Sequence, residues 1–180
     1  MLVQLDQIAK LVSRLSTARG EALVAAFNPA FEEFEINTGP RIAMCMAQFA
    51  HETGGFQWFS ELGDADYFTK YDFNSSLGND QKGDGLKYKG EGPIQITGKY
   101  NYTKVGEALG LDLLNHPELM KDLIISSRAS CWWWKSHHLN EIADINSLDS
   151  FKRITRVINP GLNGWTERAR YWAIAKTVWV

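Results

Sequence analysis

The chain has 180 residues, which is enough for one compact domain with a sizeable hydrophobic core. Hydrophobic residues make up 44% and charged residues 22% of the sequence, a balance that is typical of folded globular proteins and excludes a disordered chain. The formal net charge of −2 argues against sequence-independent binding of DNA or RNA, because phosphate binding requires a basic surface.

The first residues and the two cysteines indicate where the chain is made. The N-terminal segment lacks the basic and long apolar regions of a secretory signal. No stretch approaches the roughly eighteen apolar residues of a membrane span. Cys45 and Cys131 each lie among apolar residues and are far apart in the sequence. We therefore expect buried, reduced thiols in a chain made in the cytoplasm, with no stable membrane insertion.

Helix signals dominate the beginning of the chain. Apolar residues spaced as one helical face predict a helix over residues 4–15. Asn28 followed by Pro29 has the form of a helix cap and a first helical position. This pair predicts a short helix that opens there and runs through Phe34.

A third helix is predicted to start near Pro40 and to end at Gly54-Gly55, where glycine can adopt the left-handed cap conformation. Residues 60–92 contain many glycines and aspartates without a regular period, so we expect loop there, with small strands at most. A loop of this length in a small domain is usually functional. Further helices are predicted at 102–109, 126–138, 148–157 and 166–178, the last with Thr166 as its cap.

Glu52 lies near the end of the third predicted helix, at the edge of an apolar face that includes Met46 and Phe49. A carboxyl group partly shielded from water by apolar neighbours can stay protonated near neutral pH, as a general acid requires. An exposed glutamate at a helix terminus is the alternative. His51-Glu52 does not open a zinc-protease motif, because Gly55 stands where the second histidine is needed.

The segment after this helix supplies further carboxylates, Glu61, Asp64 and Asp66. Hydrolysis of a glycosidic bond uses two carboxyl groups, one to protonate the leaving oxygen and one to act as base or nucleophile on the other face of the sugar. An acid at a helix end followed by an acid on a nearby loop is compatible with that demand, although loop carboxylates are common.

Residues 88–102 form the most distinctive stretch of the sequence. Gly90 and Gly92 permit close approach of the backbone. Gln95 and Thr97 alternate with two isoleucines, which predicts a short strand with both polar side chains on one face. Amide, hydroxyl and aromatic groups of this kind suit sugar binding. The glycine spacing does not match a nucleotide-binding loop.

Four segments follow one another along the chain: AHETGGF at 50–56, YKGEGPIQITGKYNY at 88–102, GLDLLNHPE at 110–118 and INPGL at 158–162. In this order they resemble the family 19 glycoside hydrolases, which include plant chitinases and many endolysins of phages and prophages. The resemblance covers roughly residues 40–175. The small size, the missing secretion signal and the missing binding module make the chain similar to the endolysins of this family.

The resemblance implies roles for individual residues. Glu52 matches the general acid, Glu61 matches the catalytic base as endolysins place it, and Thr97 matches the hydroxyl that holds the attacking water with the base. Arg168 resembles an arginine of the last helix that braces the carboxylates. Gln95, Tyr100, Asn101 and Asn159 match positions that bind substrate.

Two residues depart from the family pattern. Glu91 stands where the family usually has arginine, which is expected to add negative charge beside the cleft. Asn163 stands where plant members usually have an acid, so a network built on that acid does not transfer to this chain.

These inferences predict a mainly α, lysozyme-like domain with two helical lobes, an irregular glycine-rich central segment and a substrate cleft. We expect residues 1–180 to be a single catalytic domain, without a separate wall-binding domain. The resemblance implies no cofactor and no metal.

The predicted function is that of an endolysin that hydrolyses the β-1,4 bond between N-acetylmuramic acid and N-acetylglucosamine in peptidoglycan. The mechanism is inverting, with the carboxyl groups roughly 6.5–9.5 Å apart. We expect a monomer that accumulates in the host cytoplasm and reaches the periplasmic cell wall at lysis with the help of a holin.

Three alternatives remain open at the level of sequence. A chitinase would cleave the same type of bond between N-acetylglucosamine units. A lytic transglycosylase would need one acid and no water-positioning base. A catalytically silent wall-binding module would keep the cleft, but the presence of both Glu52 and Glu61 argues against it.

Overall fold

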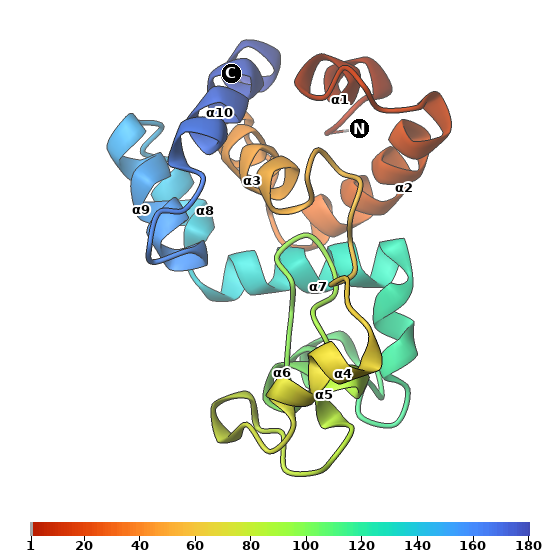
Figure 1. Cartoon of the computed structure of the whole chain (residues 1–180). Helices are drawn as coiled ribbons and strands as arrows, with labels where there is room; N and C mark the ends of the chain where they lie inside the picture. Colours follow the sequence, from red (N-terminus) through yellow and green to blue (C-terminus); the bar gives the residue numbers. More distant parts are fainter. Residues whose placement is uncertain (1) are drawn as a thin grey trace.

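The computed structural model describes residues 2–180, and Figure 1 shows that they are arranged almost entirely as helices. No strand forms in this range, where β-pairing is limited to isolated bridges. The prediction of a mainly α fold is therefore confirmed. The α-helices are α1 (Leu5–Leu11), α2 (Thr17–Glu33), α3 (Gly39–Glu52), α4 (Ala65–Phe68), α5 (Asp84–Lys87), α6 (Lys99–Leu109), α7 (Leu123–Ser136), α8 (Leu139–Ala143), α9 (Leu148–Ile158) and α10 (Trp165–Trp179), and the 3-10 helices are η1 (Thr69–Tyr71), η2 (Ser75–Leu77) and η3 (Pro117–Lys121).

The larger of two hydrophobic cores surrounds α3, which packs along α10 (Figure 1). The middle of α3 is buried on every side, and Met44, Met46 and Phe49 have no exposed surface. Helix α2 adds Phe27 and Phe31, whose rings stack with centroids 5.5 Å apart. The end of α3 is thus fixed by a rigid set of helices.

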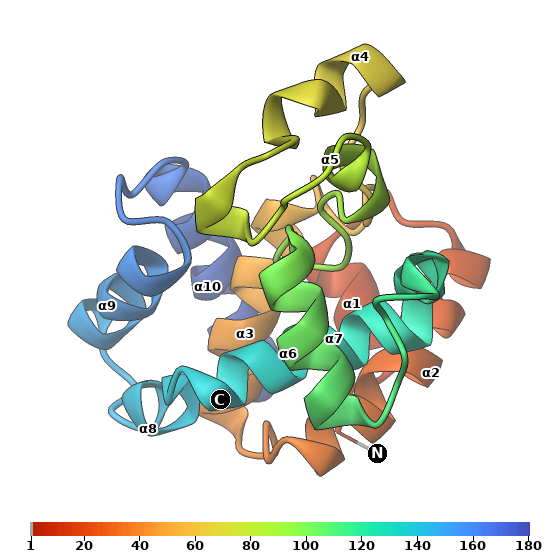
Figure 2. The same ribbon diagram turned by 90° about the horizontal axis from the view of Figure 1, so that it is seen from below.

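The smaller core lies under the glycine-rich segment and contains Tyr88, Ile96, Tyr102 and Val105. Helix α6 supplies much of it and packs against α7, as Figure 2 shows. The same α7 contributes Ala129 to this core and its later residues to the larger one. These two cores form the two predicted lobes, joined through α7.

The boundaries of α3 follow the predicted signals. Pro40 occupies the first turn, where its missing N–H group is not needed. At the other end, the Gly55 amide bonds to the Ala50 carbonyl at 2.7 Å. Gly54 and Gly55 adopt φ values of 59° and 77°, which glycine tolerates best. Helices α6, α7 and α9 likewise differ from their predicted ranges only at their ends.

Two predictions near the N-terminus are wrong. The first helix ends at Leu11 rather than at residue 15, because Val12 is extended. No new helix opens at Pro29, since α2 runs through it. The side chain of Asn28 does not cap a helix. It accepts hydrogen bonds from the Leu2 and Val3 amides, both at 2.8 Å, and so ties the N-terminal segment to α2.

The cap predicted for the last helix is also displaced. Gly164, with φ of 72°, is the N-cap of α10, and Thr166 lies inside the first turn. Residues 60–92 are not plain loop, because α4, η1, η2 and α5 place four short helical turns there. No helix within residues 2–180 is long and apolar enough to cross a membrane.

Candidate active site

Glu52 is the last residue of α3, and its carboxylate is held by Arg168 of α10. The Arg168 side chain is only 1% exposed, whereas that of Glu52 is 21% exposed. Arg168 also donates to Gln48 Oε1 at 2.6 Å, one helical turn before Glu52. Gln48 in turn donates to the Thr155 hydroxyl at 2.7 Å. The Glu52 carboxylate is therefore oriented by a buried polar network while part of it faces solvent.

The loop between α9 and α10 completes the support of Arg168. The Arg168 Nε donates to the Asn163 carbonyl at 3.0 Å. The Asn159 side chain accepts a hydrogen bond from the Asn163 amide at 3.3 Å, so it shapes this loop. Asn163 acts here through its main chain, and its side-chain type is not what holds Arg168.

Glu61 lies on the segment that runs from α3 toward α4, and it has different partners from Glu52. One of its oxygens accepts hydrogen bonds from the Tyr71 hydroxyl at 3.0 Å and the Tyr67 hydroxyl at 3.2 Å. The other accepts from the Gly90 amide at 3.2 Å. Burial and the bond to Glu61 raise the pKa of Tyr71, so that this hydroxyl keeps its proton and remains a donor.

Residues 59–61, here called the Glu61 segment, are paired with residues 90–92. The Glu61 amide donates to the Gly90 carbonyl at 2.8 Å, and the Gly92 amide donates to the Phe59 carbonyl at 2.6 Å. The chain then turns back, and Gln95 adopts a left-handed φ of 55°. The strand predicted over 94–97 is therefore wrong, because a tight turn occupies its place.

This turn nevertheless brings the polar side chains of the predicted strand to Glu61. A Cβ atom placed on Gly90 would lie 2.7 Å from Gln95 Oε1 and 3.1 Å from both Glu61 Oε2 and Thr97 Oγ1. The three side chains thus surround a position that only glycine leaves open. Thr97 lies beside the predicted base, in a position to share a water molecule with it.

The other predicted substrate-binding residues lie in the first turn of α6 or on the opposite lobe. Tyr100 is 58% exposed in the first turn of α6. Asn101 donates to the Thr97 carbonyl at 2.7 Å and so fixes the start of that helix next to Thr97. Asn159 belongs to the loop that supports Arg168, at the Glu52 side of the site.

Glu91 does not place its charge beside the cleft, which corrects the expectation from the sequence. Its side chain is 3% exposed and accepts a hydrogen bond from the Ser60 hydroxyl. Lys89 lies 3.9 Å from the Glu91 carboxylate and donates to the Glu61 carbonyl at 3.0 Å. Burial raises the pKa of Glu91. Glu91 therefore supports the Glu61 segment from the interior.

Within residues 2–180, no group of three or more His, Cys, Asp or Glu side chains could hold a metal ion. The loop aspartates Asp80 and Asp84 lie 2.6 and 3.9 Å from Lys99, which lowers the pKa of Asp80. Trp58, between the two glutamates, is 55% exposed.

Sequence reasoning missed three residues that support the predicted carboxyl groups: Gln48, which binds Arg168, and Tyr67 and Tyr71, which bind Glu61. Gln48 precedes Glu52 by one helical turn, and this spacing could have revealed it. Tyr67 and Tyr71 gave no comparable signal, because they reach Glu61 only through the folding of α4 and η1.

Comparison with known proteins identifies the family. The family model for class I chitinases, glycoside hydrolase family 19, matches residues 20–148. A glycosyl hydrolase family 19 domain-containing protein from Haemophilus influenzae is 37% identical over an alignment of 157 residues, which covers 71% of this chain and 74% of the relative. An endochitinase from Solanum tuberosum is 36% identical over 71% of this chain, but only 47% of its own length is covered. The chain thus spans about half the length of the plant relatives it matches.

Solved structures show the same fold. Chitinase C from Streptomyces griseus superposes with a TM-score of 0.73 at 24% identity, covering 98% of this chain and 76% of the other. A class IV chitinase from Zea mays gives a TM-score of 0.65 at 23% identity, covering 98% and 92%. The lysozyme-like helical fold is therefore confirmed. The chain belongs to glycoside hydrolase family 19 and is a chitinase-like glycoside hydrolase.

Proposed function

We propose that this glycoside hydrolase is an endolysin that cleaves the β-1,4 bond of peptidoglycan in one displacement with inversion. The observation that carries the mechanism is the separate anchoring of two carboxyl groups. Glu52 is held on the larger lobe by Arg168, and Glu61 is held on the adjoining segment by Tyr67 and Tyr71. One acid and one base, each with its own support, are what an inverting hydrolase uses.

In this mechanism Glu52 protonates the glycosidic oxygen as the bond to the sugar breaks. Arg168 binds one oxygen of the Glu52 carboxyl group, and the other is without a hydrogen-bond partner among residues 2–180 and can face the substrate. Glu61 removes a proton from the attacking water. The Thr97 hydroxyl donates to the Gln95 carbonyl at 2.9 Å and can still accept a hydrogen bond from that water.

We infer peptidoglycan rather than chitin as the substrate from the state of the two cysteines. Cys45 and Cys131 are both buried and unpaired, which favours an enzyme that folds in a reducing compartment. An enzyme kept in the host cytoplasm meets peptidoglycan after release through a holin at lysis. The plant relatives are named endochitinases, so chitin is the second candidate substrate.

The test is to digest purified peptidoglycan and chitin oligomers and to analyse the first products. Proton NMR in the first minutes should show the α anomer at the new reducing end, because water attacks opposite the leaving group. Mass spectrometry should find reducing N-acetylmuramic acid. A first product with the β anomer would contradict single displacement. Products with 1,6-anhydro ends would indicate a lytic transglycosylase, and faster turnover of chitin oligomers would favour a chitinase.

The role of Glu61 is tested by Glu61→Gln, which keeps the shape of the side chain but removes the base. Activity should fall by about 10²–10⁴-fold. Asp66→Asn is the matched control, because Asp66 is exposed in the first turn of α4 and should tolerate the amide with activity within about twofold of the parent. If Asp66→Asn is inactive while Glu61→Gln is active, the base is misassigned.

A further inference from the structure

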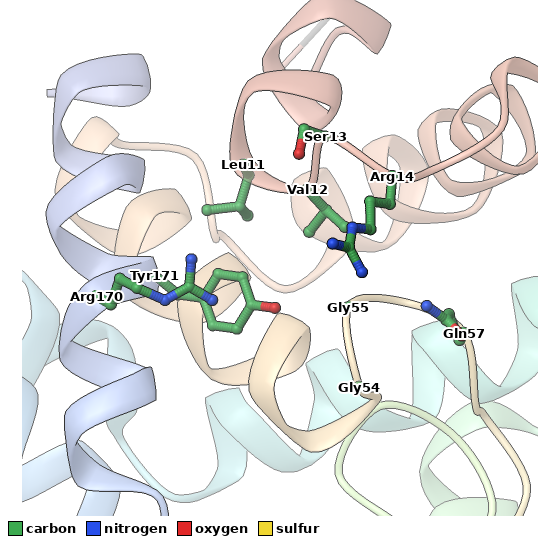
Figure 3. A pocket seen from close by; sticks show the side chains of 9 residues that line it. All are labelled: Leu11, Val12, Ser13, Arg14, Gly54, Gly55, Gln57, Arg170 and Tyr171. Atoms are coloured by element: carbon green, nitrogen blue, oxygen red, sulfur yellow. The ribbon is translucent and has the colours of Figure 1, made fainter.

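A pocket of about 410 Å³ lies behind the segment that follows Glu52. Figure 3 shows that three parts of the chain meet there: the end of α1 with the residues after it, the turn after α3, and α10. The four segments that resemble the family do not include the residues at the end of α1 or the pocket residues of α10. The pocket is lined by Leu11, Val12, Ser13, Arg14, Gly54, Gly55, Gln57, Arg170 and Tyr171.

The pocket carries positive charge and no lining carboxylate. Figure 3 shows the guanidinium groups of Arg14 and Arg170 on opposite sides, with the Tyr171 hydroxyl between them. Arg14 is exposed and has no ion-pair partner in the part of the chain that the structure describes. Arg170 stacks on the Tyr171 ring at 4.6 Å, and its contact with the exposed Glu167 is long, at 3.9 Å. Both guanidinium groups can therefore bind an incoming anion.

The floor of the pocket is kept open by glycine. A Cβ atom on Gly55 would lie 3.2 Å from Val12 and 3.5 Å from the Tyr171 hydroxyl. Gly54 and Gly55 follow Glu52 with only Thr53 between them, so the pocket wall and the predicted acid belong to one continuous turn. The pocket wall therefore begins two residues along the chain from the predicted acid.

We propose that this pocket binds a carboxylate of the peptide stem carried by the N-acetylmuramic acid at the cleavage site. The planar guanidinium group matches a carboxylate with two parallel hydrogen bonds, and two such groups suit an acidic peptide. Chitin bears no carboxylate, so Arg14 and Arg170 would select between two polymers that share the same glycosidic bond. This inference rests on the proposed function.

The test compares two forms of the same polymer, peptidoglycan with intact stems and glycan strands from which an amidase has removed the stems. Arg14→Ala with Arg170→Ala should raise KM on intact peptidoglycan by roughly tenfold, with kcat nearly unchanged, because a charge-assisted contact is lost. On stem-free strands the double variant should match the parent. Arg153→Ala is the control, since Arg153 is an exposed arginine of α9 outside the pocket.

Direct binding provides a readout that does not depend on turnover. Free acidic stem peptide, titrated into the parent and followed by NMR, should shift the signals of Gly54, Gly55 and Tyr171. The shifts should be absent in the double variant and partly restored in Arg14→Lys with Arg170→Lys. Equal loss of activity on both forms of glycan, or no binding of the stem peptide to the parent, would overturn the pocket assignment. Failure of the parent to cleave either form would instead contradict the proposed function.

Discussion

The two predicted catalytic carboxyl groups are held by different chemistry. Glu52 is bound to a buried cation, Arg168, whereas Glu61 accepts hydrogen bonds from neutral hydroxyls. A carboxylate that contacts a buried guanidinium keeps a fixed direction, since Arg168 has few other ways to satisfy its charge. The hydroxyl partners of Glu61 orient its carboxylate without placing a second charge beside it.

Replacing Glu52 with Gln should lower kcat by about 10²–10⁴-fold, because the amide cannot supply a proton. The amide oxygen can still accept the hydrogen bond from Arg168, so the thermal midpoint should change little. Glu52→Ala removes that acceptor and should also lower the thermal midpoint, because it leaves a buried arginine without its carboxylate partner.

Glu32→Gln is the control for these two variants, because Glu32 is an exposed residue of α2. Circular dichroism and rates on purified peptidoglycan measure both effects. A Glu52→Gln protein with activity within tenfold of the parent would rule out Glu52 as the proton donor.

At the scale of elements, the pairing between the Glu61 segment and residues 90–92 organises the site. Gly90 is the contact point, and its φ is not in the left-handed region, so alanine fits the backbone there. Gly90→Ala should therefore act through its methyl group, which displaces Glu61, Gln95 and Thr97. Activity should fall at least tenfold with a small change in thermal midpoint. Gly161→Ala is the matched control, because its Cβ would meet only ordinary contacts at 3.5 Å. Equal activity of both variants would show that the arrangement around Gly90 is not needed.

The elements that the sequence predicted well are those whose boundaries depend on local signals. Pro40 and Gly55 mark the ends of α3, and Gly110 ends α6 with a φ of 69°. The prediction at Pro29 failed because Asn28 bonds to Leu2 and Val3, a tertiary contact that no local pattern reveals.

The same distinction applies to the candidate site. The motif residues Glu52, Glu61 and Thr97 were predicted from the sequence because they resemble a family pattern. The turn at Gln95 was missed, since alternation of polar and apolar residues predicts a strand whether or not a partner strand exists. The partners of Glu61 depend on short helices in a segment without a regular period.

At the scale of the whole molecule, both thiols lie within the larger core. Burial raises the pKa of Cys45 and of Cys131 well above the usual value, so reactive thiolate is scarce. The native protein should therefore resist an aromatic disulfide reagent for hours, and the unfolded chain should release two equivalents, matching its two cysteines. Reductant should leave the thermal midpoint unchanged. Rapid labelling of the native protein would contradict the buried placement.

Helix α7 belongs to both hydrophobic cores, with Ala129 in one and Cys131 and Trp134 in the other. Neither lobe can lose its packing without exposing one side of this helix to water. The free energy that keeps α7 helical is thus common to both lobes, and their melting is thermodynamically coupled. Although the chain folds around two centres, it should behave as one cooperative unit, with the lobe that carries Glu61 as resistant to heat as the lobe that carries Glu52.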